Sequence, residues 1–175
     1  MNRWHTVAIT VIITLAFAVP VHAQGWYMDA GLEFVDLGDQ LSNVDLGLGL
    51  GLGFGLDFGN GMSLNMGVGS SAHRQNGVDL TYTRLWIGPR ITFISGGVLP
   101  YLEGGFMAHY LEWDFFLESI DGSGLYIRTG VDLPLATGGK VGGYLAYSDW
   151  SGEDNAGFNG NATTTALGVK YTFGY

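Results

Sequence analysis

Residues 44–58 read VDLGLGLGLGFGLDF, and this stretch decides the fold class. Every even position from Val44 to Phe58 is apolar, whereas the odd positions hold five glycines between Asp45 and Asp57. Successive side chains of a β-strand point to opposite faces, so a strict period of two predicts a strand with one apolar and one nearly bare face. Asn60-Gly61 follows at once, a pair typical of a tight hairpin turn.

Seven other segments show the same alternation. The expected strands are residues 25–35, 44–58, 62–72, 78–93, 101–111, 124–133, 140–147 and 163–173. In the fourth segment the apolar parity changes between Tyr82 and Leu85, so we expect a β-bulge near Thr83 and Arg84. Pro89 in the same segment is a mild objection to a strand, because proline cannot donate a ladder hydrogen bond.

The connections between these segments alternate in character. Those at residues 59–61, 95–99 and 134–139 are short, whereas the others are more polar, and those at 112–123 and 148–162 are also long. Short periplasmic turns alternating with longer external loops are typical of bacterial outer-membrane barrels. The more polar face, rich in glycine with few charges, suits a narrow lumen better than water. A soluble β-sandwich or a lipocalin-like barrel remains the alternative.

The N-terminus has the layout of a cleavable signal peptide. Arg3 precedes an uncharged apolar run at residues 6–19, Pro20 ends the run, and Val21-His22-Ala23 supplies small residues before a cleavage site. The run is shorter than the roughly 20 residues that a spanning helix needs. We therefore expect a signal peptide at residues 1–23 and one domain at residues 24–175, an all-β, eight-stranded antiparallel up-and-down transmembrane barrel.

Composition excludes several functions. The chain has 16 acidic and 7 basic residues, which argues against a nucleic-acid partner, because phosphate binding needs a basic surface. It has no cysteine, which excludes thiol catalysis and cysteine metal sites. We expect no cofactor and no resident metal. The acidic residues of the two long connections could hold a hard cation, although a solvated rim is the simpler interpretation.

Two short stretches resemble a known family. Residues 168–173, GVKYTF, are similar to the C-terminal signal of outer-membrane proteins, although Gly174 and Tyr175 extend beyond the usual aromatic end. Residues 100–105, PYLEGG, resemble a strand opening of the OmpA-, OmpX- and opacity-type eight-stranded barrels. The resemblance implies a location in the bacterial outer membrane and recognition of the last strand by the barrel assembly machinery.

Two sets of residues are candidates for structural roles in such a barrel. Buried lumen charges must be paired, so we expect an ion network made of Arg90, Glu103, Arg128, Asp132 and Lys170. Aromatic residues near strand ends favour an interfacial girdle. Its expected members are Trp26, Tyr101, Trp113, Trp150, Tyr171 and Phe173.

We expect no enzyme. The stretch at residues 144–158 faintly resembles the active-site strand of lipid A deacylases, but Ser148 lacks the histidine two residues before it that their His-x-Ser pair requires. His109 could reach Ser148 only if their strands were neighbours, and residues 124–133 should lie between them. The expected function is a structural and surface-contact barrel with a side-chain-filled lumen and external loops that contact lipopolysaccharide, host or solutes. We expect a monomer. A narrow cation-preferring channel and, less favoured, a lipid A-modifying enzyme remain as alternatives.

Overall fold

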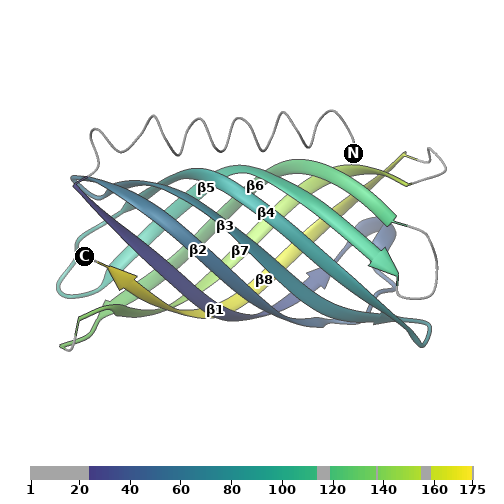
Figure 1. Ribbon diagram of the computed structural model, residues 1–175, viewed down its shortest axis with the longest axis horizontal. Coiled ribbons are helices and arrows are strands. Elements are labelled where there is room, and N and C mark those ends of the chain that lie inside the picture. Colours follow the sequence, from purple (N-terminus) through teal and green to yellow (C-terminus); the bar gives the residue numbers. More distant parts are fainter. Residues whose placement is uncertain (1–23, 114–118, 137, 155–158, 175) are drawn as a thin grey trace.

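The computed structural model describes residues 24–113, 119–136, 138–154 and 159–174. The expected signal peptide at residues 1–23 lies outside these residues. Eight antiparallel strands each pair with the next in the chain, and the last pairs with the first to close a barrel (Figure 1). They are β1 Gly25–Leu37, β2 Gly47–Gly59, β3 Met62–Gln75, β4 Val78–Thr92, β5 Leu99–Trp113, β6 Ser119–Pro134, β7 Lys140–Asp154 and β8 Asn159–Gly174, with a short 3-10 helix η1 at Asp39–Leu41.

The all-β, eight-stranded up-and-down architecture is thus confirmed. No helix among the described residues has the length and apolar character needed to cross a membrane. The end of β8 and the three short turns lie together at the left of Figure 1, and η1 lies at the opposite end.

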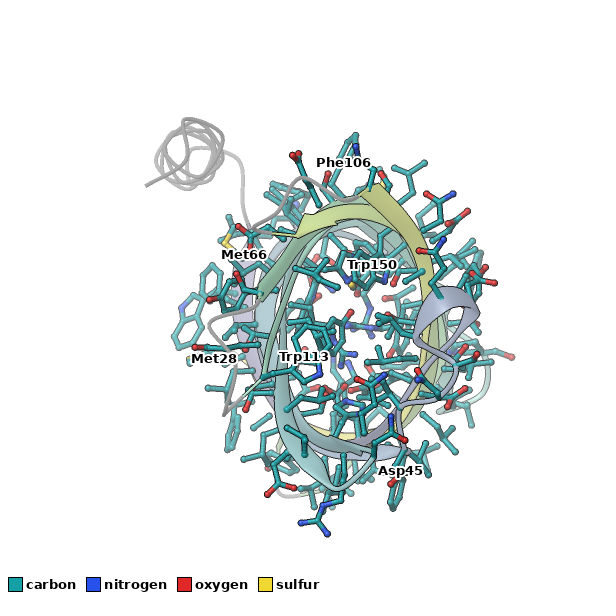
Figure 2. All side chains as sticks on the ribbon, turned by 90° about the vertical axis from the view of Figure 1, so that its right-hand side faces the viewer. Met28, Asp45, Met66, Phe106, Trp113 and Trp150 are labelled. Carbon is teal, nitrogen blue, oxygen red and sulfur yellow. The ribbon has the colours of Figure 1, made fainter. Side chains whose placement is uncertain are left out.

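The glycine-rich strand β2 has the orientation that its alternation predicts. Its glycines from Gly47 to Gly55 are buried in the barrel, whereas Leu48, Leu50 and Leu52 are 58–64% exposed on the outside. Figure 2 shows the same division elsewhere, with Met28, Met66 and Phe106 pointing outward. This exposed apolar surface is the one that a bilayer would cover. The first apolar residue of the quoted stretch is an exception, because Val44 precedes β2 and is buried inside.

Bare glycine positions accommodate large rings from other strands. A Cβ added to Gly55 would overlap the ring of Tyr27, and one added to Gly168 would overlap the ring of Tyr144. An eight-stranded barrel has an interior just wide enough for side chains to fill it. The glycines therefore provide the space that the aromatic lumen residues occupy.

Strands β5 to β8 are longer than expected. The long connections at residues 112–123 and 148–162 are largely strand, since β6 begins at Ser119, β7 ends at Asp154 and β8 begins at Asn159. The outward positions of these extensions are polar, for example Ser123, Asp149 and Asn161. The apolar alternation therefore stops near the membrane boundary, although the hydrogen-bonded ladder continues beyond it.

The bulge expected in β4 is wrong. The β3–β4 register is continuous from Met62↔Ile91 to Gln75↔Val78. Leu80 and Tyr82 point inward in the same register as Arg84, and both are about 1% exposed. The apolar residues of β4 change parity because its inward side chains become apolar at the end of the barrel that carries η1.

Candidate functional site: the barrel lumen

The lumen near the short turns carries a network of paired charges. Arg90 on β4 and Asp132 on β6 form a buried ion pair. Lys170 on β8 lies with its Nζ 3.5 Å from Asp132 Oδ1 and 3.8 Å from Asp29 Oδ2. Strands on opposite sides of the barrel thus contribute to one cluster, in which Asp132 contacts two cations.

A second carboxylate, Glu103 on β5, lies deeper and is 1% exposed. It accepts hydrogen bonds from Arg128 Nη1 at 3.2 Å, Tyr126 Oη at 2.9 Å and Asn65 Nδ2 at 2.7 Å. A buried carboxylate is costly unless its oxygens are satisfied, and here three donors satisfy it. The five residues expected to form a lumen network therefore all point inward, and they lie in two adjoining clusters.

Sequence reasoning missed a third pair, Arg84 on β4 with Glu33 on β1. Tyr144 Oη donates to the same carboxylate at 2.5 Å. Arg84 was assigned to a bulge, which hid its orientation. Counting in steps of two from Arg90 through Trp86 would have placed Arg84 in the lumen.

Aromatic rings cover the guanidinium groups. The Cζ of Arg90 lies 3.6 Å from the ring centroid of Tyr101, and the Cζ of Arg128 lies 4.6 Å from Trp86 and 4.9 Å from Tyr144. Arginine is weakly hydrated and stacks on aromatic faces, which suits it to such a site. The polar lumen is therefore filled by stacked rings and paired charges.

An apolar plug closes the other end of the lumen. It contains η1 residue Leu41 and buried side chains of the loop and strands around it, with Trp113 and Ile120 packed against them. Its buried members are Val35, Leu37, Leu41, Val44, Leu80, Tyr82, Tyr101, Leu111, Tyr144, Ala146, Trp150, Ala162 and Ala166. Tyr101 and Tyr144 connect this cluster to the charged layers.

Three of the expected girdle residues face the wrong way for that role. Tyr101 and Trp150 are 2% and 3% exposed inside the barrel, and Trp113 donates from its indole to Gln75 Oε1 at 3.0 Å. Figure 2 shows Trp113 and Trp150 pointing into the interior. Position near a strand end does not determine the face, which depends on parity within the strand.

The other three expected girdle residues are on the outer surface. Trp26 is 44% exposed and stacks on Phe54 with centroids 6.4 Å apart, and Tyr171 contacts Phe173 edge to face at 4.5 Å. These rings belong to the end of the barrel with the short turns.

Two serine–histidine combinations bear on catalysis. His109 stacks on Trp150 at 4.5 Å and contacts Tyr82 Oη through Nδ1 at 2.5 Å, while β6 separates its strand from that of Ser148. Ser71 Oγ, by contrast, lies 2.8 Å from His73 Nε2. Ser71 is only 3% exposed, so a substrate carbonyl could not reach its hydroxyl.

No group of three or more metal-ligating side chains occurs among the residues that the structure describes. The acidic residues at 114 and 118, which the sequence suggested as cation ligands, lie outside the described part of the chain.

The family model described as an outer membrane protein beta-barrel domain matches residues 8–173. The chain belongs to this family. It is therefore a bacterial outer-membrane β-barrel protein, and the resemblance to small barrels of that membrane is confirmed. No curated protein matches its sequence.

Solved structures share the fold at low identity. The crystal structure of Neisserial surface protein A has a TM-score of 0.72 and 14% identity, covering 85% of this chain and 96% of that one. OprG from Pseudomonas aeruginosa has a TM-score of 0.59 and 14% identity, covering 87% and 97%. Ail from Yersinia pestis, in complex with the heparin analogue sucrose octasulfate, has a TM-score of 0.52 and 14% identity, covering 85% and 98%.

Proposed function

We propose that this outer-membrane barrel is a closed, non-enzymatic structural protein whose outer end, the end that carries η1, makes surface contacts. The observation that supports this most directly is the filled lumen, with paired charges in one half and an apolar plug in the other. An ion would have to lose its hydration shell to enter the plug, which is costly without replacement ligands.

The charge balance of the lumen argues against the cation-preferring channel. A cation-preferring lumen needs an excess of inward acids, but Arg84 adds a base and Asp45 is exposed at the rim. The buried carboxylates of Glu33, Glu103 and Asp132 each contact at least one cationic side chain. There is no surplus of buried negative charge in this network to attract a permeating cation.

The outer end is strongly acidic. Its only basic side chain in the described ranges is Arg74, which pairs with Asp79 at 2.8 Å. The exposed acids of this end are Asp36, Asp39, Asp45, Asp79, Glu112, Asp149 and Glu153. We infer that it contacts cationic partners, or lipopolysaccharide phosphates through divalent cations, because direct contact with a polyanion would be repulsive. Ail, by contrast, has been crystallised in complex with the heparin analogue sucrose octasulfate.

Two further proposals, on assembly and on oligomeric state, rest on family membership and on the strand pairing. We propose that the barrel assembly machinery recognises β8, whose C-terminal part carries the outward aromatic Phe173. We also propose a monomer, because the closed ladder leaves no sheet edge for a second copy.

Planar-bilayer recording tests closure. Purified barrel in a bilayer should give no steady openings at moderate voltage, while a large porin in the same membrane serves as the positive control. Reproducible cation-selective steps that scale with protein concentration would overturn the closed-barrel proposal.

Vesicle binding tests the acidic outer end of the barrel. Calcium should increase association with lipopolysaccharide vesicles, and an unchanged association would contradict the inferred cation bridge.

A further inference from the structure

A cavity of about 280 Å³ lies at the mouth of the barrel that carries the short turns. Residues of all eight strands line it, together with the β2–β3 turn and Ile94 after β4. In bacterial outer-membrane barrels this end faces the periplasm. The charged network closes its inner side, so a solute can enter from the periplasm without passing through the barrel.

Two donors that line this cavity have no hydrogen-bond or ion-pair partner among the described residues. Thr172 Oγ1 is buried and has no hydrogen-bond partner among the described residues, although most buried hydroxyls have one. Lys140 forms no ion pair with any described residue, and its closest recorded aromatic contact is the ring of Tyr27 at 5.9 Å. Lys140 and Thr172 are direct partners in the β7–β8 register and both line the cavity.

The ammonium of Lys140 and the hydroxyl of Thr172 are donors of the kind that bind an oxyanion. Side chains of direct cross-strand partners have Cβ atoms about 4.5–5.5 Å apart, so an ammonium and a hydroxyl can donate to one acceptor group between them. Arg90 also lines the cavity, with its Cζ 5.8 Å from the Tyr27 ring. Two cations therefore flank one ring, on a wall that offers donors.

The carboxylates of the cavity are already engaged. Asp132 contacts Arg90 and Lys170, and Asp57 Oδ1 accepts the backbone N–H of Gly59 at 2.8 Å. Lys140 is thus the cation whose charge is least compensated in this part of the described structure. An incoming anion would neutralise the charge of Lys140, whereas an incoming cation would meet carboxylates that already have partners.

We propose that this cavity binds a small organic oxyanion, a carboxylate or phosphate, taken from the periplasm and held by Lys140 and Thr172. The volume is near the lower end of the range for small-molecule pockets, which limits the ligand to few non-hydrogen atoms. Apolar rim residues Met62, Ile94 and Leu99 favour an anion that carries a short carbon skeleton over a bare inorganic ion.

Nuclear magnetic resonance titration of the isotope-labelled barrel tests this. The barrel is held in maltoside micelles, which carry no phosphate, and is titrated with butyrate, glycerol phosphate, inorganic phosphate and, as the cationic comparison, butylammonium. Butyrate or glycerol phosphate should cause saturable shifts at the amides of Lys140, Thr172 and Tyr27, and inorganic phosphate should bind more weakly.

The variants Lys140→Gln and Thr172→Val should each weaken binding, the first by about tenfold or more because it removes a charge-assisted hydrogen bond. Arg74→Gln, which removes one positive charge at the other end of the barrel, is the matched control and should bind like the original. Heat-modifiable gel migration shows that each variant is folded.

The proposal fails if no anion gives saturable shifts, if butylammonium binds better, or if Lys140→Gln binds butyrate and glycerol phosphate unchanged. Preference for inorganic phosphate over both organic anions would overturn the part of the proposal that rests on the apolar rim. None of these outcomes depends on whether the barrel conducts.

Discussion

Arg84 on β4 and Glu33 on β1 form an ion pair across two intervening strands. The positions between them are Gly51 on β2 and Gly69 on β3, which are register partners of each other. A Cβ at Gly69 would lie 3.1 Å from both Arg84 Nε and Glu33 Oε1. The missing side chain of Gly69 therefore leaves the space in which charges from distant strands meet.

This pair should be strongly coupled. Either Glu33→Gln or Arg84→Met should lower the free energy of unfolding by roughly 3–5 kcal/mol, because it leaves its buried partner uncompensated. The double variant should lose less than the sum of the two. Urea unfolding of the barrel in lipid vesicles measures all three.

The exposed pair Arg74–Asp79 is the control for that experiment. Replacing Arg74 by Gln should leave the unfolding midpoint unchanged, because water screens exposed pairs. Strictly additive losses for Glu33 and Arg84 would show that their contact contributes nothing.

Two glycines of β2 should respond differently to alanine. Gly55→Ala should destabilise the barrel by about 1–3 kcal/mol, because the new Cβ would overlap the ring of Tyr27, whose hydroxyl lies 2.9 Å from Ser63 Oγ. Gly51→Ala should be tolerated, because its Cβ would lie 3.9 Å from the nearest atoms. Both glycines face the lumen from the same strand, so equal losses in urea unfolding would refute the ring-space interpretation.

The orientation of the tryptophans should be visible by fluorescence. Brominated lipid chains quench tryptophans that contact them, so Trp26→Phe should remove most of the quenchable emission. Trp150→Phe should leave that quenchable component intact, because Trp150 is inside the plug. Loss of quenching in Trp150→Phe would place its ring against lipid and contradict the correction to the girdle.

The C-terminal strand should affect assembly more than stability. Phe173→Ala is expected to lower the folded fraction in cells several-fold, if the assembly machinery recognises this ring. Val169→Ala is the matched control, because Val169 is also outward on β8 and similarly exposed. Heat-modifiable migration of membrane extracts measures both, and equal folded fractions would contradict a recognition role for Phe173.

Much of the fold could be predicted from local alternation. Eight alternating segments, of which the glycine–leucine repeat of β2 is the clearest, predicted the number of strands and their outward faces. They could be recognised because period two is a local property of an extended chain. The ends of β5 to β8 could not be found this way. Their outward positions are polar and their inward positions are mostly glycine or apolar, so the alternation with an apolar outward face is absent there. The cross-strand pairing nevertheless continues through Ser123 and Asp149.

The lumen was predicted less well for a physical reason. Alternation identifies which side chains point inward, and so it identified Arg90, Glu103 and Arg128 as candidates. It does not tell which inward residues meet, because partners such as Glu33 and Arg84 come from strands that are not neighbours. Proximity to strand ends, rather than alternation, placed Tyr101, Trp113 and Trp150 in the girdle, and their parity within the strands turns them inward.

The sequence by itself determined that this chain forms eight membrane-spanning strands with a glycine-lined inner wall. Only the closed tertiary structure decided that the lumen is plugged at the outer end, filled by paired charges below the plug and hollow only at the mouth with the short turns. The physical reason is that closure brings β8 against β1 and converts separate inward faces into one shared interior. Volume and charge must balance in that interior across all eight strands at once.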